Sequence, residues 1–115
     1  MKRRRYCLTL DLKDDPELIA EYLRYHQQGW PEVTKSILDS GIEEMEIYLL
    51  GTRMFMIMGV NERFSFAAKS EADRNNPKVQ EWEQLMWKFQ QPLLQAQPGE
   101  KWLLMERIFA LQGPA

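Results

Sequence analysis

Two residue types that often hold metals or form disulfides are nearly absent from this chain. Its 115 residues include one cysteine, Cys7, and one histidine, His26. A lone cysteine cannot form an internal disulfide, and the two residues together supply too few soft ligands for zinc. The adjacent acids Asp14 and Asp15 are placed to begin a helix. We therefore expect no dedicated metal site and a reducing, cytoplasmic location.

Long apolar runs and an excess of charge of one sign are also missing. No stretch is long enough to span a bilayer, and Asp11 interrupts the N-terminal region before a signal-peptide core could form. The 15 Lys and Arg nearly balance the 17 Asp and Glu, for a net charge of -2. We interpret the basic run Lys2–Arg5 as a solvated lead-in to the first strand. Neither nucleic acid nor a membrane is expected as a partner.

The composition is that of one folded domain covering residues 1–115. Hydrophobic residues make up 44% of the chain and charged residues 28%, a balance typical of globular proteins. The sequence has no glycine-rich phosphate loop after a strand, no GxSxG motif and no Cys–His grouping. Nucleotide chemistry and covalent acyl transfer are therefore not indicated.

The first third of the chain predicts a strand followed by two helices. Apolar and polar residues alternate over residues 5–12, the period of a half-buried strand. Asp15 and Pro16 then predict the start of a helix that runs to Gln28 and stops near Gly29. A second helix should begin at Pro31 and end near Gly41; its apolar side comprises Trp30, Val33, Ile37 and Leu38.

The rest predicts a hairpin, further helices and a last strand. Residues 41–60 form the hairpin, whose second strand is apolar on both faces and therefore central in the sheet. Residues 61–70 predict a short helix, 71–77 a polar break, and 77–92 a longer helix ended by Pro92. Residues 101–111 predict the final strand.

This β-α-β-β-α-β order predicts an α+β, ferredoxin-like fold: an antiparallel sheet with its helices on one face. The other face of the sheet then has nothing in a chain of this size to cover it. Two such sheets facing each other would bury both, so we expect a homodimer.

His26 is the first candidate for chemistry. It lies one helical turn after Tyr22, so both side chains share a helix face. A lone histidine at such a position is most often a core residue satisfied by a backbone partner. The alternative is an imidazole in a cavity, with a pKa near the working pH, that exchanges a proton. The spacing leaves both interpretations open.

The aromatic residues are equally ambiguous. Trp82, Met86 and Phe89 have the spacing of a core helix face, but an indole can also stack against a sugar. Methionines could line such a cavity softly or simply fill a core; those of the hairpin are Met45, Met54, Met56 and Met58.

Several short motifs, in order along nearly the whole chain, resemble the L-rhamnose mutarotase family. They are EYLRYH, GWPEV, EIYLL, VQEW and MERIFAL. The resemblance implies a dimeric α/β-barrel fold and an isomerase that interconverts the anomers of a 6-deoxy-L-hexose, without a metal or redox cofactor. It implies that His26 is the proton donor, that Tyr22 contacts the sugar and that Trp82 borders it.

Two positions depart from that family's pattern. Met45 stands where the family has a pocket tyrosine, and Glu83 replaces the second member of a tryptophan pair. Relatives of the family act on L-fucose as well, so we expect these two residues to shift the preference away from L-rhamnose. Two other functions are compatible with a lone histidine and aromatic residues at a cavity: a cofactor-independent monooxygenase of the same fold class, and a non-catalytic ligand-binding module.

Overall fold

The computed structural model describes residues 4–111, so Lys2 and Arg3 of the basic run lie outside the described part. Strands and helices follow in the order β1 (Arg4–Leu12), α1 (Pro16–Gln28), α2 (Pro31–Asp39), β2 (Ile42–Leu50), β3 (Arg53–Val60), α3 (Phe66–Arg74), α4 (Pro77–Trp87), β4 (Gln90–Gln91) and β5 (Leu103–Leu104).

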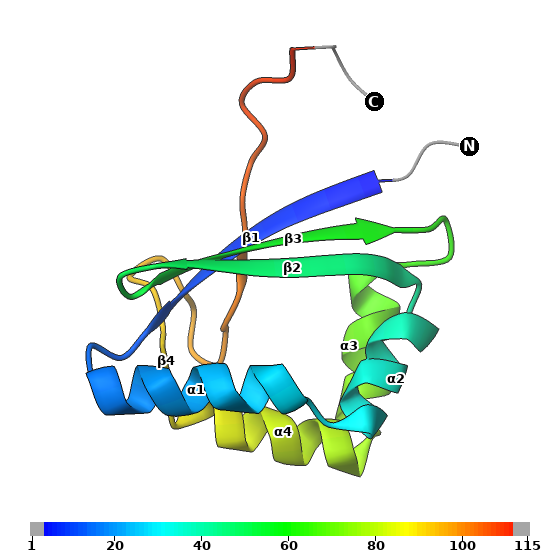
Figure 1. Ribbon diagram of the computed structural model, residues 1–115. Helices are drawn as coiled ribbons and strands as arrows, with labels where there is room; N and C mark the ends of the chain where they lie inside the picture. The colour runs from blue at the N-terminus through cyan, green and yellow to red at the C-terminus, as the bar shows by residue number, and fades with distance from the viewer. Residues whose placement is uncertain (1–3, 112–115) are drawn as a thin grey trace.

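The strands form one antiparallel sheet in the order β2-β3-β1-β4, with β5 also paired to β1. The prediction that the second hairpin strand is central is thereby confirmed, because β3 lies between β2 and β1. All four helices lie on one side of the sheet (Figure 1). The α+β, ferredoxin-like arrangement expected from the sequence is therefore present.

The register of the strands decides which side chains face the helices. Met54, Met56 and Met58 of β3 pair with Leu10, Leu8 and Tyr6 of β1, and with Leu49, Ile47 and Met45 of β2. Since side chains alternate along a strand, Phe55 and Ile57 point to the opposite face. The methionines of β3 are buried between the sheet and the helices.

Helix α1 begins and ends where its sequence predicts. The Asp15 carboxylate accepts hydrogen bonds from the backbone amides of Glu17 and Leu18, at 3.0 and 3.2 Å. At the other end Gly29 has a φ of 66°, a left-handed conformation that glycine adopts without strain, and its amide bonds the carbonyl of Tyr25. These caps set the two ends of α1, and the burial of Tyr22 in the core shows which face of the helix turns inward.

Four sequence-based predictions about these elements were wrong. Helix α3 extends through the expected polar break to Arg74, and α4 ends at Trp87 rather than at Pro92. The last strand shrinks to Leu103–Leu104. Leu38, expected on the apolar side of α2, is 57% exposed.

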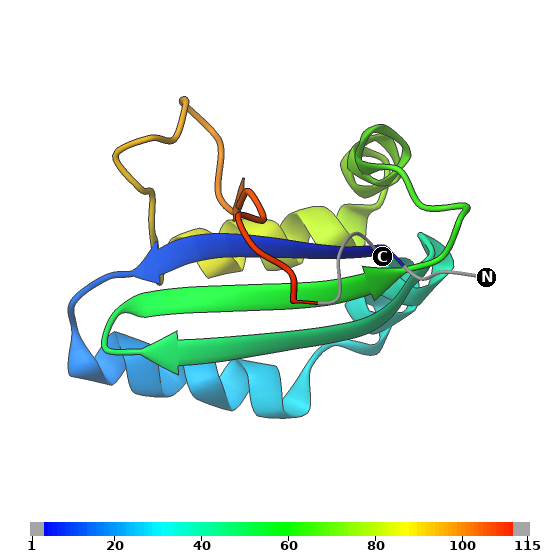
Figure 2. The same ribbon diagram turned by 90° about the horizontal axis from the view of Figure 1, so that it is seen from above.

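The face of the sheet opposite the helices stays open. After β5 the chain leaves the sheet on this side, and residues 105–111 rise above β1 and β3 (Figures 1 and 2). Several large apolar side chains of this segment are exposed: Met105, Ile108, Phe109 and Leu111.

Candidate functional site

A cavity of about 390 Å³ lies between the helix-facing side of the sheet and the four helices. Apolar side chains make up most of its wall, and a few polar ones interrupt them, as is usual for sites that bind small molecules. All five residues singled out from the sequence line this cavity: Tyr22, His26, Met45, Trp82 and Glu83.

His26 stands on the last turn of α1 at the cavity. Its Nδ1 lies 3.1 Å from the backbone carbonyl oxygen of Tyr22, one turn earlier. A carbonyl can only accept, so Nδ1 donates and carries the hydrogen, which leaves Nε2 with its lone pair in the neutral ring. The side chain keeps an exposed side, so His26 is not enclosed in the core.

The surroundings of the imidazole favour its neutral form. Protein atoms around the ring lower the pKa of His26 below its ordinary value of 6.5, an effect that outweighs the hydrogen bond to the Tyr22 carbonyl. The ring is therefore neutral near pH 7, with Nε2 ready to accept a proton.

Tyr22 is buried beside this histidine. The two ring centroids are 4.3 Å apart, and the Tyr22 hydroxyl accepts a hydrogen bond from Nε2 of Gln90 at 3.2 Å. Burial raises the pKa of Tyr22 to about 12, with a further rise from the charge of Glu83 and a partial offset from the Gln90 hydrogen bond. The phenol is therefore a neutral hydrogen-bond donor near pH 7 rather than a proton carrier.

Trp82 belongs both to the core and to the cavity wall. It is buried, and its indole packs edge-on against His26, with ring centroids 5.5 Å apart, and against Trp30 at 5.0 Å. Trp82 therefore has both features considered for it from the sequence: it packs in the core, and it lies at the cavity wall. One indole can fill the core and still offer a surface to a ligand.

Met45 and Glu83 reach the cavity from opposite sides. Met45 projects from β2, and two methionines of β3, Met56 and Met58, line the cavity near it. Met54 does not line it and is 1% exposed, so of the two interpretations left open for these methionines, core filling applies at that position. On α4, a carboxylate oxygen of Glu83 accepts a hydrogen bond from Nζ of Lys101 at 2.6 Å.

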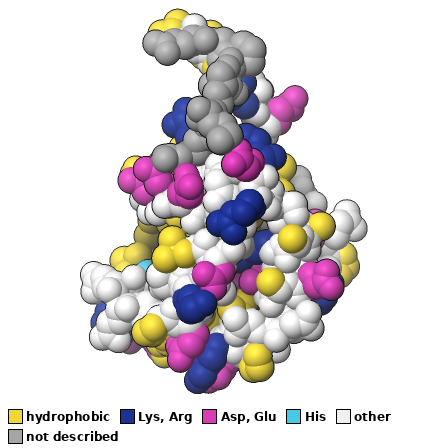
Figure 3. Space-filling model, turned by 90° about the vertical axis from the view of Figure 1, so that its right-hand side faces the viewer, with side chains coloured by type: hydrophobic (Ala, Val, Ile, Leu, Met, Phe, Trp, Pro, Cys, Tyr) yellow, Lys and Arg dark blue, Asp and Glu magenta, His cyan; other side chains and the backbone are white. Residues whose placement is uncertain are grey.

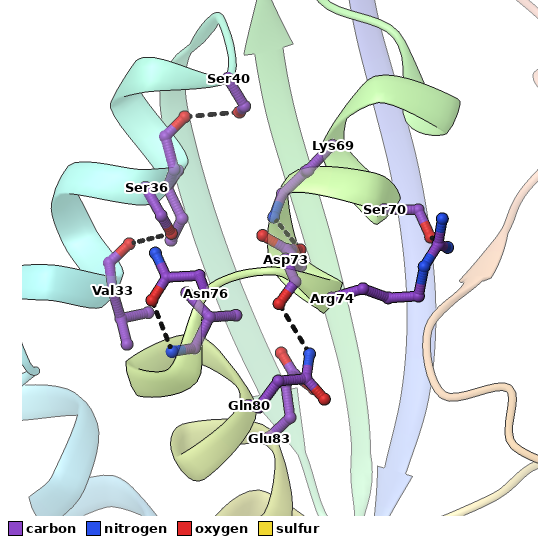
Figure 4. Close-up of polar contacts among 12 residues, drawn as sticks. Val33, Ser36, Ser40, Lys69, Ser70, Asp73, Arg74, Asn76, Gln80 and Glu83 are labelled. Carbon is purple, nitrogen blue, oxygen red and sulfur yellow. Dashed lines mark hydrogen bonds and ion pairs between the residues drawn. The ribbon is translucent and has the colours of Figure 1, made fainter.

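Helix α3 adds a polar end that the sequence did not indicate. Lys69 and Asp73 form an ion pair at 2.7 Å and line the cavity. In Figure 4 both side chains lie between α3 and α2, and the carbonyl of Asp73 accepts a hydrogen bond from Gln80 of α4. These charges stand among polar side chains of three helices.

A family model for L-rhamnose mutarotase matches residues 5–111. The chain belongs to the L-rhamnose mutarotase family. The mutarotases of this family are isomerases that act on sugars, which confirms the predicted class of enzyme.

Two curated relatives and two solved structures resemble this mutarotase. It is 48% identical to an L-fucose mutarotase of Xanthomonas campestris pv. campestris, over 96% of this chain and 90% of the relative. It is 39% identical to a UPF0734 protein of Dictyostelium discoideum, over 92% and 88%.

The solved structures support the fold. An L-rhamnose mutarotase from Formosa agariphila has a TM-score of 0.69 and 20% identity, and covers 94% of this chain and 98% of its own. Tetracenomycin F2 cyclase of Streptomyces glaucescens, a type-II polyketide cyclase, has a TM-score of 0.61 and 16% identity, with 96% and 99% covered. The dimeric α/β-barrel class of fold is thereby confirmed, and the second structure illustrates that this fold also hosts other chemistry.

Three further observations concern residues 4–111 of the mutarotase. No helix in this range is long and apolar enough to cross a membrane, and no group of three or more His, Cys, Asp and Glu side chains is placed to hold a metal ion. On the face seen in Figure 3, basic and acidic side chains are mixed instead of gathered by sign.

The sequence missed Gln90, Lys69 and Asp73 as lining residues. The sequence pattern predicts Gln90 inside a helix that in the structure ends at Trp87, and it predicts an end of α3 before Asp73. The signal in the sequence was the break in the apolar pattern directly after Phe89, where Gln90 and Gln91 precede Pro92.

Proposed function

We propose that this mutarotase interconverts the α and β anomers of a 6-deoxy-L-hexose pyranose and prefers L-fucose to L-rhamnose. The observation that carries the proposal is the position of His26, with Nδ1 bound to a backbone carbonyl and Nε2 available, at a cavity that Tyr22 and Trp82 also line. The 48% identity to an L-fucose mutarotase supports the choice of sugar.

The net change in ring opening is the transfer of one proton. Nε2 of neutral His26 takes the proton from the anomeric hydroxyl, the bond between C1 and the ring oxygen breaks, and the imidazolium returns the proton to that oxygen. Both oxygens are bonded to C1, so one imidazole nitrogen can reach each of them with a small shift. Rotation of the aldehyde about the bond between C1 and C2, followed by the reverse steps, gives the other anomer.

Tyr22 and Trp82 hold the sugar in this scheme. Because the pKa of Tyr22 is raised to about 12, its hydroxyl stays protonated and can donate to a sugar oxygen. The Trp82 indole supplies an apolar surface for the C–H face of the pyranose. Holding the sugar against His26 lowers the entropic cost of proton transfer.

Met45 and Glu83 support a preference for L-fucose. Met45 offers no hydrogen bond on the β2 side, whereas Glu83 brings a carboxylate that Lys101 orients. L-fucose and L-rhamnose differ in the directions of their ring hydroxyls, so a wall polar on the α4 side and apolar on the β2 side discriminates between them.

Saturation-transfer NMR tests the activity and the sugar preference together. The anomeric protons of L-fucose and of L-rhamnose are followed with and without protein, and we expect the protein to speed exchange of L-fucose more. Heat-denatured protein is the control for catalysis by buffer. Exchange of neither sugar above the solvent rate would refute the function; faster exchange of L-rhamnose would refute only the preference.

We also propose that the protein is a homodimer formed through the open face of the sheet. Phe55 and Ile57 point to that face, and the segment 105–111, which carries several exposed apolar side chains, rises on the same side of the sheet. A second copy of this surface would bury both sets of side chains at once.

A further inference from the structure

Gln90 has a buried amide of which only one end is satisfied by the protein. The residue is 3% exposed and lines the cavity. Its Nε2 donates to the hydroxyl of Tyr22, but within residues 4–111 no protein group hydrogen-bonds its Oε1. A buried amide oxygen without a partner destabilises a fold, so such an atom requires a specific reason.

The position of Gln90 is imposed by the backbone around it. It pairs with the buried Leu12 of β1, and paired residues of neighbouring strands share a face, so its side chain is directed inward with that of Leu12. Turning the amide over would let Oε1 accept from the Tyr22 hydroxyl but would leave the NH₂ group unpaired instead. In both orientations one polar group is left for a partner from outside the chain.

The orientation in the structure creates a donor beside an acceptor. The Tyr22 oxygen accepts from Gln90, so its own hydrogen is free to donate, while Oε1 of Gln90 is free to accept. Two neighbouring hydroxyls of a pyranose are the complementary partner, because each hydroxyl can donate and accept.

We propose that Gln90 binds the substrate: Oε1 accepts a hydrogen bond from a ring hydroxyl, and Nε2 holds the Tyr22 hydroxyl so that it donates to a neighbouring sugar oxygen. This inference rests on the proposed sugar substrate. Gln90 thereby selects sugars that present a hydroxyl at this place.

The test compares Gln90→Met with the wild type. Methionine has a similar length and no amide, so it fills the same space without either hydrogen bond. We expect KM for L-fucose to rise about tenfold, which corresponds to the loss of about one hydrogen bond to the sugar. The thermal midpoint should stay the same or rise. The matched control is Gln91→Met, next in the chain and exposed, which should change neither value.

Singly deoxygenated L-fucoses identify the hydroxyl. The sugar that lacks the contacted hydroxyl should bind the wild type about as weakly as L-fucose binds Gln90→Met. For that sugar, the Gln90→Met substitution should weaken binding no further. If Gln90→Met weakened the binding of every deoxygenated sugar by the same factor, the proposed contact with one hydroxyl would be wrong.

The two proposals fail in different ways. A wild type that exchanges no anomers refutes the function, whereas an active wild type with an unchanged KM in Gln90→Met refutes only the role of Gln90. A Gln90→Met protein of lower stability and unchanged KM would show that the amide is structural. If Gln90→Met does not fold, Gln90→Asn replaces it in the test. The shorter asparagine side chain keeps the amide but withdraws its oxygen from the sugar, so KM should again rise. An unchanged KM in Gln90→Asn would refute the contact.

Discussion

His26 carries the pH dependence of the proposed reaction, because only its neutral ring can accept a proton at Nε2. The protein atoms on one side of the ring lower the pKa of His26 below 6.5, so the ring is still neutral at a pH where an imidazole fully surrounded by water is half protonated. The acid limb of kcat/KM should therefore have an apparent pKa below 6.5. A pH series of anomer exchange, corrected for the buffer rate, measures it; an apparent pKa above 6.5 would contradict this role.

The same shift affects folding stability with a defined sign. The unfolded chain protonates His26 near 6.5, while the folded protein takes up that proton only at lower pH. The unfolded state thus binds more protons as pH falls through 6.5, so His26 contributes a loss of stability on the acid side and none above pH 7.

Replacement of His26 by asparagine separates catalysis from packing. Because the imidazole keeps an exposed side, His26→Asn should leave the thermal midpoint nearly unchanged and reduce anomer exchange on the order of a hundredfold or more. Gln27→Ala is the control, since Gln27 is the exposed next residue on the same turn and does not line the cavity. A fully active His26→Asn protein would end the proposed mechanism.

Among the elements, α1 depends on its N-terminal cap. The Asp15 carboxylate binds two amides of the first turn, so Asp15→Ala should lower the free energy of unfolding by about 1 kcal/mol. Asp14→Ala removes an exposed carboxylate of the same charge one residue earlier and should have little effect. Urea unfolding of both variants measures the difference; equal losses would indicate a general charge effect in place of the cap.

The elements that the sequence predicted well are those whose ends are set locally. Asp15, Pro16 and Gly29 specify α1 through contacts within a few residues of each end. The end of α4 is set by tertiary structure instead: Phe89 is fully buried and Gln90 pairs with β1, which the helical spacing before them does not encode. The final strand was overestimated for a related reason, since residues 105–111 alternate like a strand but leave the sheet of their own chain.

The candidate site shows the same division. Tyr22 and His26 could be paired from helical spacing, and the resemblance to a family singled out Trp82, Met45 and Glu83. Gln90 and Asp73 could not be foreseen, because their places at the cavity depend on where α4 stops and how far α3 extends. Helical spacing thus placed Tyr22 and His26 together, the resemblance proposed their roles, and long-range packing determined the polar groups around them.

For the whole molecule, the open face of the sheet dictates the proposed assembly. Ile108 is 90% exposed and Phe109 is 73% exposed, on a segment that extends away from its own sheet. Large apolar side chains that project together in this way mark a surface for association. In the proposed homodimer each copy lays its segment against the sheet of the other.

Ile108 and Phe109 stand at the centre of this proposed interface. The double variant Ile108→Asp, Phe109→Asp places two carboxylates in the proposed interface. They would be buried without partners in the dimer but fully hydrated in the monomer. The double variant should therefore sediment as a monomer at concentrations where the wild type is a dimer. Leu94→Asp is the matched control, because Leu94 is equally apolar and fully exposed but lies in the loop after β4. A monomeric wild type would refute the homodimer, and a double variant that stays dimeric would place the interface elsewhere. Since α1 and its cavity lie on the far side of the sheet from this segment, the monomer should remain folded and keep His26 and Tyr22 in place.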